Sequence, residues 1–125
     1  MRAPALIAIL LTAQACAPEP PPPPPARLQL DCSLSYEALS AKVLAQPGLR
    51  PAPQTPGEPY RFYTTPGGSE AFVFTEPGAP GHPAILKQEG SRKDGAAFMT
   101  NTGCPYGDKA GYAKLLAYLE GLQTR

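Results

Sequence analysis

Two stretches of the chain have apolar side chains at helical spacing, one on each side of a β-rich segment. The first covers residues 36–46, where Tyr36, Leu39 and Val43 recur every three or four positions and a Pro-Gly pair ends the run. The second begins after Asp108, a good N-cap residue. Its apolar stripe consists of Tyr112, Leu115, Leu116, Leu119 and Leu122. The pattern therefore predicts an N-terminal and a C-terminal helix.

The segment between these helices has the composition of short strands separated by turns. The four strand-like runs are residues 60–64, 70–75, 84–88 and 96–100. The first two flank a Pro-Gly-Gly turn and therefore indicate a hairpin. Residues 89–95 have a polar centre and are expected to form an exposed turn. Residues 49–59 contain four prolines and would make a poor strand.

Alternation along the first two strands sorts their side chains onto two faces. Phe72 and Phe74 share one face of the second strand, and Tyr60 and Phe62 share one face of the first. We expect this aromatic face to lie under the helices, with Val73 on the other face. The sequence thus predicts an α+β fold, in which a four-stranded antiparallel sheet has the N-terminal and the C-terminal helix packed on one face, in the order α-β-β-β-β-α.

The N-terminus has the three parts of a secretory signal. Arg2 supplies a positive charge, residues 3–12 are almost wholly apolar, and Ala13-Gln14-Ala15 has small residues where a signal peptidase cuts. The apolar run is far shorter than the roughly 20 residues that a membrane-spanning helix needs. Residues 1–15 are therefore predicted to be a signal peptide that is removed, with Cys16 as the first mature residue.

The run Ala13-Gln14-Ala15-Cys16 also resembles a bacterial lipobox. The resemblance implies that the thiol of Cys16 is diacylated and that the chain is a membrane-anchored lipoprotein of the cell envelope, facing the periplasm. Ala17 stands where an aspartate would favour retention at the inner membrane, so the outer membrane is slightly favoured. The alternative is a freely secreted protein in which Cys16 is only the first mature residue.

Residues 16–30 are predicted to be this anchor cysteine followed by a proline-rich tether. Residues 20–25 are all proline, and a polyproline II helix rises ~3.1 Å per residue, so this run should hold the domain about 20 Å from the bilayer. A proline run can also be a ligand of SH3-type domains. We favour the spacer because a semi-rigid spacer is useful when one end is fixed. Residues 31–125 then form one small globular domain.

The chain has three cysteines, and an odd count in an exported protein leaves one thiol to explain. Lipidation of Cys16 explains it and leaves Cys32 and Cys104 as a pair. Export permits a disulfide between them, which would join the start of the domain to its last segment. The alternative is two buried thiols.

Composition and motifs exclude several function classes. Once Arg2 is removed with the signal, the basic and acidic residues are equal in number and the basic ones are scattered, unlike the concentrated basic face of a nucleic-acid-binding protein. The sequence contains no C-x-x-C redox pair and no G-x-S-x-G nucleophile elbow. His82 is the only histidine, whereas a zinc site needs about three or four ligands. We therefore predict no catalytic residue, no metal and no cofactor.

One loop stands out as a possible binding loop. It covers residues 76–83, and its candidate binding residues are Pro77, Gly78, Gly81, His82 and Pro83. The run Pro80-Gly81-His82-Pro83-Ala84-Ile85 is similar to runs in small uncharacterised exported bacterial proteins, a resemblance that brings no activity with it.

These features predict an anchored, non-catalytic binding or assembly accessory with a protein partner in the envelope. The alternative is a small envelope enzyme that uses His82 with a carboxylate. That alternative requires His82 to lie in a concave pocket within hydrogen-bond reach of an acid.

Overall fold

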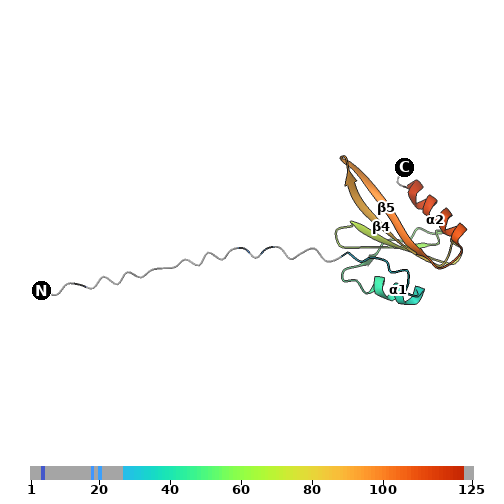
Figure 1. The fold of residues 1–125 in the computed structure, drawn as a ribbon, viewed down its shortest axis with the longest axis horizontal. Helices are drawn as coiled ribbons and strands as arrows, with labels where there is room; N and C mark the ends of the chain where they lie inside the picture. The colour runs from blue at the N-terminus through green and yellow to red at the C-terminus, as the bar shows by residue number, and fades with distance from the viewer. Residues whose placement is uncertain (1–3, 5–17, 19, 21–26, 123–125) are drawn as a thin grey trace.

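The computed structural model describes Pro4, Pro18, Pro20 and residues 27–122 (Figure 1). The predicted signal peptide apart from Pro4, the predicted lipidation site Cys16 and most of the proline run lie outside the described residues. Those features therefore stay predictions, and the fold described below is that of residues 27–122.

Two helices flank a single antiparallel sheet in which each strand pairs with the next one along the chain. The elements are α1 (Tyr36–Leu44), β1 (Arg50–Pro51), β2 (Tyr60–Thr64), β3 (Glu70–Thr75), β4 (Ala84–Lys93), β5 (Ala96–Pro105) and α2 (Lys109–Gly121). The α+β class, both helices and the β2–β3 hairpin are as the sequence predicts. The Asp108 cap is also confirmed, since its Oδ2 accepts a hydrogen bond from the Gly111 N–H at 2.7 Å.

The sheet has five strands rather than the predicted four. The additional strand, β1, lies at the start of the proline-rich connector, where Arg50 pairs with Thr64 and Pro51 pairs with Tyr63. This pairing uses only backbone groups at the margin of the sheet, where proline is tolerated. A side-chain pattern of two residues carries no strand signal, and for that reason the prediction missed it.

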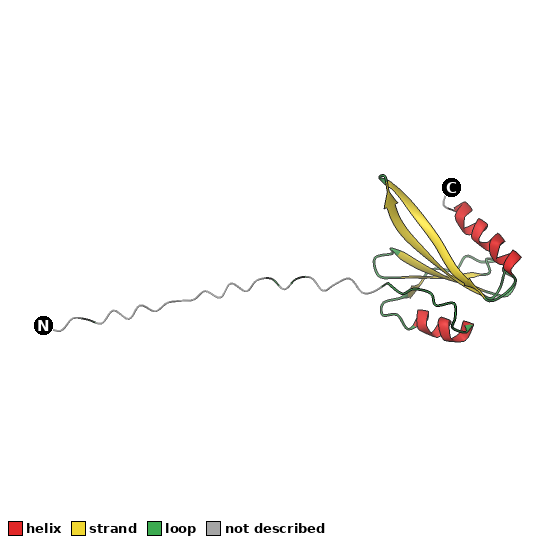
Figure 2. Cartoon of the chain, viewed as in Figure 1, coloured by secondary structure: helices red, strands yellow, loops and turns green. Residues whose placement is uncertain are grey.

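The β4–β5 hairpin is also much longer than predicted. Both strands have ten residues, and only Asp94 and Gly95 lie between them. The two turn residues have φ angles of 53° and 79°, as a tight two-residue hairpin turn requires. The predicted exposed turn over residues 89–95 is therefore wrong. Figure 2 shows the far half of this hairpin as an arm that extends beyond the rest of the sheet.

The two helices pack on opposite faces of the sheet and not on one face as predicted. Phe62 pairs with Val73 in the β2–β3 register, so Phe62 lies on the face opposite Phe72 and Phe74. The α2 face buries Tyr60, Val73, Ala79, Ala84, Leu86, Leu115 and Leu119. The α1 face buries Leu39, Val43, Phe72, Phe74, Ile85 and Cys104. Strands β3 and β4 are thus covered on both sides (Figure 1).

The predicted disulfide between Cys32 and Cys104 is confirmed, with the two Cα atoms 5.2 Å apart. It joins the segment before α1 to the end of β5 across 72 positions of sequence. Cys104 lies within β5, on the face that α1 covers, and not in a break before α2. The bridge therefore fixes the N-terminal segment to the edge of the sheet.

Candidate functional site

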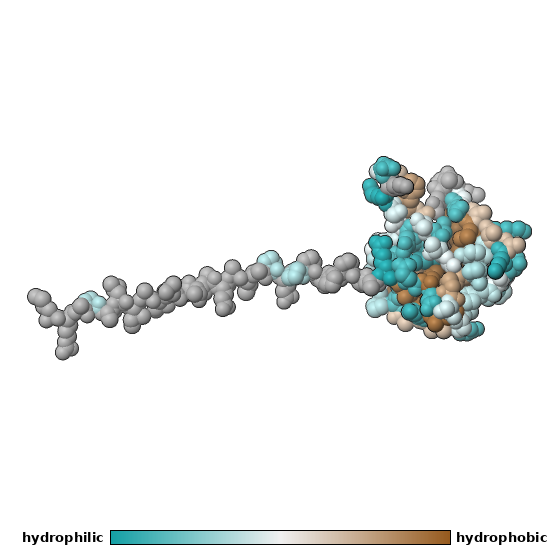
Figure 3. Space-filling view, in the orientation of Figure 1, coloured by the Kyte–Doolittle hydropathy of each residue, from teal (hydrophilic) through white to brown (hydrophobic). Residues whose placement is uncertain are grey.

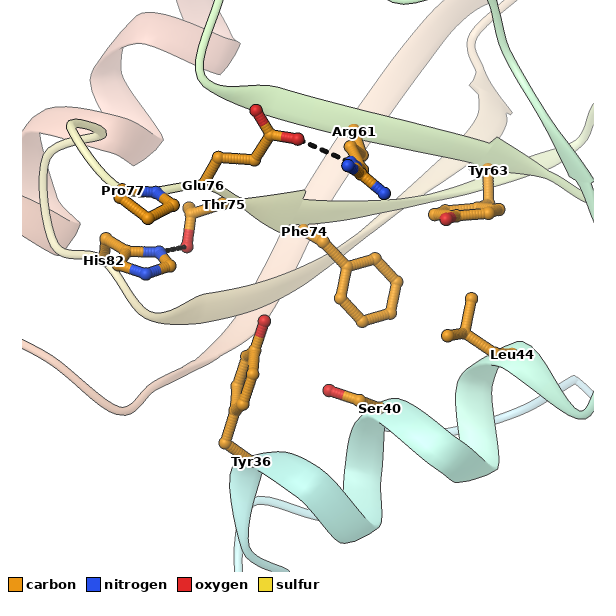
Figure 4. A pocket seen from close by; sticks show the side chains of 10 residues that line it. All are labelled: Tyr36, Ser40, Leu44, Arg61, Tyr63, Phe74, Thr75, Glu76, Pro77 and His82. Atoms are coloured by element: carbon orange, nitrogen blue, oxygen red, sulfur yellow. Dashed lines mark hydrogen bonds and ion pairs between the residues drawn. The ribbon is translucent and has the colours of Figure 1, made fainter.

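A groove of about 600 Å³ lies between α1 and the α1 face of β2 and β3 (Figure 4). It exists because α1 packs over β3 and β4 and leaves part of β2 uncovered on that side. The residues that line it are Tyr36, Ser40, Leu44, Arg61, Tyr63, Phe74, Thr75, Glu76, Pro77 and His82.

One wall of the groove is a stripe along α1. Tyr36, Ser40 and Leu44 are spaced four residues apart and therefore share one side of the helix. The adjacent stripe, Leu39 and Val43, is fully buried in the core and fixes the rotation of the helix. Leu44 remains 47% exposed at the end of the helix, which is a large open fraction for a leucine.

The floor and the near wall are aromatic. Tyr63 and Phe74 meet edge to face, with ring centroids 5.5 Å apart. Tyr36 meets Tyr106 in the same way at 5.7 Å, and the Tyr106 hydroxyl donates to the Leu34 carbonyl at 2.8 Å. The aromatic surface is therefore held in place before any ligand arrives.

A charged pair lies at one end of the groove. The guanidinium of Arg61 donates to Glu76 Oε1, and Gln54 Nε2 donates to Glu76 Oε2 at 3.1 Å. The hydrogen bond from Arg61 to Glu76 raises the pKa of Arg61, which keeps its charge. Arg61 is 59% exposed in this pair, so the pair adds little to stability and leaves further N–H donors of Arg61 for a ligand.

His82 lies at the same end, half-buried, and its ring is positioned by a buried threonine. Its Nδ1 is 2.8 Å from Thr75 Oγ1, and this hydroxyl also accepts the Ala84 N–H at 2.9 Å. The ring nitrogen that this contact does not use is Nε2. The carboxylate of Glu76, in contrast, points towards Arg61 (Figure 4). The enzyme alternative requires His82 to lie in a concave pocket within hydrogen-bond reach of an acid. The groove meets the first requirement, but the partner of Nδ1 is the hydroxyl of Thr75 and not an acid.

The structure divides the predicted binding loop into two parts. Pro77 and His82 line the groove, whereas Gly78, Gly81 and Pro83 do not. Gly81 instead packs against the first turn of α2, where a Cβ on it would lie 2.5 Å from the Tyr112 nitrogen. This contact fixes the loop on α2, so Gly81 serves to position His82.

Sequence reasoning missed most of the groove. The apolar pattern grouped Tyr36 with Leu39 and Val43 on the helix, and no role was assigned to Arg61 or Ser40. A signal was present, since Ser40 and Leu44 continue the line of Tyr36 beside the core stripe of α1. Which strand this second stripe faces depends on the sheet register, which the helix pattern alone does not give.

A second group of charges lies near the start of β3, where the N-terminal segment joins the domain. Lys87 of β4 is 1% exposed, and its Nζ donates to the Leu28 carbonyl at 2.7 Å. The same Nζ is 3.7 Å from Glu70, which is 5% exposed, and forms an ion pair with Glu89. Arg27 adds a contact to Glu70 at 3.3 Å. This cluster balances two cations with two carboxylates, as a structural cluster does.

Two negative findings apply to the residues that the structure describes. They contain no group of three or more histidine, cysteine, aspartate or glutamate side chains arranged to hold a metal ion. None of their helices combines the length and the apolar character needed to cross a bilayer.

Comparison with known proteins adds no identification. No family model matches the sequence, and no match was found among curated proteins or solved structures.

Proposed function

We propose that this chain is a lipid-anchored accessory of the bacterial envelope that binds a protein partner through the groove between α1 and β2. The single observation that carries the binding role is the groove itself, with an aromatic floor fixed by ring contacts and an exposed cation at one end. The anchoring role rests on the signal-like N-terminus, the lipobox-like Cys16 and the proline spacer.

The side chains in the groove favour protein binding over catalysis. Tyrosine and arginine are enriched at the energetically dominant positions of protein interfaces, and the groove contains Tyr36, Tyr63 and Arg61. An apolar side chain of the partner would pack on Tyr63 and Phe74. A carbonyl or carboxylate of the partner would accept hydrogen bonds from Arg61. The ordered rings lower the entropic cost of binding, since little has to be immobilised.

The proposal is tested by cross-linking the tagged full-length protein in cells and identifying the attached proteins by mass spectrometry. We expect one dominant envelope partner. Leu44→Arg should remove it, because the new side chain fills the mouth of the groove. Leu122→Arg is the matched control, since Leu122 is a similarly exposed leucine at the end of the other helix. Equal cross-linking in the two variants would place the interface elsewhere, and no specific partner in the wild type would refute the proposal.

The anchor is tested separately with Cys16→Ala. We expect the wild type in the membrane fraction, with a mass increment from diacylglycerol, and the variant in the soluble periplasmic fraction. A wild-type protein that is soluble and without the increment would refute the anchor and leave the groove proposal standing.

The position of His82 in the groove favours one second candidate, an envelope enzyme that uses His82 with a carboxylate. His82→Ala separates the two functions. If the protein is an accessory, the His82→Ala variant should keep both its partner cross-link and its cellular role. If the protein is an enzyme, the variant should keep the cross-link and lose the cellular role.

A further inference from the structure

Strand β5 is one edge of the sheet, and it is a long one. It pairs with β4 over its whole length of ten residues, and among the residues that the structure describes no strand pairs with its other side. The opposite edge, β1, has two residues and contains a proline. The two edges therefore differ greatly in how much free backbone they present.

The turn determines which backbone groups of β5 face away from β4. Lys93 and Ala96 flank the two-residue turn, so their backbones form a hydrogen-bonded pair, and this relation recurs at every second residue. The alternation agrees with the other side of β4, where the Gly90 N–H donates to the Ser69 carbonyl at 3.0 Å. The β5 residues whose N–H and C=O point outward are therefore Ala97, Met99, Asn101 and Gly103.

The outward edge lacks the features by which proteins protect exposed strands. Edge strands are commonly short, charged or interrupted by proline or a bulge. Residues 96–105 contain no charged side chain, and their only proline is the last residue. Phe98 is 49% exposed and Met99 is 40% exposed on the two faces of the arm. At the tip of the arm, at the top of Figure 3, hydrophobic residues lie beside hydrophilic ones.

We propose that β5 pairs with β5 of a second copy of this chain, antiparallel and about a two-fold axis through Met99. The outward residues 97, 99 and 101 are symmetric about this position, so Met99 faces its own counterpart and Ala97 faces Asn101 of the other copy. Each facing pair exchanges both backbone hydrogen bonds. Phe98 then lies beside Thr100 of the other copy on the α1 face.

A second copy suits this edge because the strand is uncharged. Pairing an uncharged strand with itself brings no like charges together, and the antiparallel arrangement is isologous, the geometry of two-fold dimers. The disulfide joins residue 32 to Cys104 near the far end of β5, so the part of the edge that this bridge leaves clear runs from Ala97 to Asn101. The interface is small, and we therefore expect a dimer that depends on concentration.

The experiment uses the mature chain with Cys16→Ala, so that no third thiol is present. Sedimentation velocity over a wide concentration range should show a monomer converting to a dimer. Met99→Pro should stay monomeric with an unchanged urea midpoint, because this proline removes an N–H that points outward and none of the bonds to β4. Met99→Leu keeps the N–H and should still form dimers.

Mild oxidation of variants with one added cysteine, in the same Cys16→Ala background, tests the register. Met99→Cys should give a covalent dimer, since facing Cα atoms of such a pair are about 5.5 Å apart and within disulfide range. Ala97→Cys should not, because residue 97 would lie four positions, or about 13 Å, from its own counterpart. A wild type that is monomeric at every concentration, a dimer of Met99→Pro, or equal cross-linking of the two cysteine variants would each overturn the proposal.

Discussion

Lys87→Met tests how far the buried charges near the start of β3 determine stability. Methionine has a similar length and flexibility, so the change removes the ammonium group and little volume. It leaves the Leu28 carbonyl without its donor and leaves Glu70 directly across from Glu89 in the β3–β4 register. Two carboxylates facing each other repel, and Glu70 is 5% exposed.

The expected loss of unfolding free energy depends on how deeply the charged groups that remain after Lys87→Met are buried. Removing one partner of a buried ion pair costs about 3 to 5 kcal/mol. Arg27 still lies 3.3 Å from Glu70, although Arg27 is itself 57% exposed. Because Arg27 still partly compensates the charge of Glu70, the lower end of this range applies. We therefore expect Lys87→Met to lower the unfolding free energy by about 3 kcal/mol. With a urea m-value of about 1 to 3 kcal/mol/M, the midpoint should fall by roughly 1 to 3 M.

Two controls make this prediction refutable by urea unfolding. Lys42→Met changes an exposed lysine on α1 and should change the unfolding free energy by less than about 0.5 kcal/mol. The double variant Lys87→Met/Glu70→Leu removes both buried charges and should return to within about 1 kcal/mol of the wild type. A loss below about 1 kcal/mol in the single variant, or no recovery in the double variant, would show that the pair behaves as a solvated one.

Three further predictions concern cross-linking, packing and pH. Replacing Cys32 and Cys104 together with alanine should cost about 4 kcal/mol in urea unfolding, the loop entropy of a closure spanning 72 positions. Gly111→Ala should cost about 1 to 3 kcal/mol and shift the His82 NMR signals, since its Cβ would lie 2.3 Å from the Gly81 nitrogen and push the loop off α2. Burial raises the pKa of Tyr112 above its usual value of 10, so the stability from its neutral form is complete below pH 10 and is lost as the pH rises through the folded-state pKa. Urea midpoints at pH 9 and 11 should therefore differ less in Tyr112→Phe than in the wild type.

The parts of the fold that the sequence predicts are those with a strong local pattern. Tyr36, Leu39 and Val43 place α1, and the aromatic runs around the Pro-Gly-Gly turn place β2 and β3. The arm was missed because its outer half contacts solvent, and there the alternation of apolar and polar residues no longer marks a strand. The Asp94-Gly95 pair was the available signal, since such dipeptides are typical of tight hairpin turns.

The side of the sheet on which each helix lies is a property of register and not of composition. Phe62 and Phe72 look equivalent as aromatic strand residues. Only the pairing of Phe62 with Val73 places them on opposite faces. The groove depends on the same fact, because α2 packs on the opposite face and does not cover β2 on the face where α1 lies. For this reason the sequence could indicate Pro77 and His82 as candidate residues but could not place Arg61 in the same groove.

The bridge between Cys32 and Cys104 determines how the domain carries mechanical load. When the chain is pulled between its N-terminal segment and α2, covalent tension enters at Arg27, crosses the disulfide and leaves through residues 105–121. Residues 33–103 form a closed loop that this tension bypasses. All the residues that line the groove lie within that loop, so tension between the N-terminal segment and α2 does not pass through the backbone of its walls.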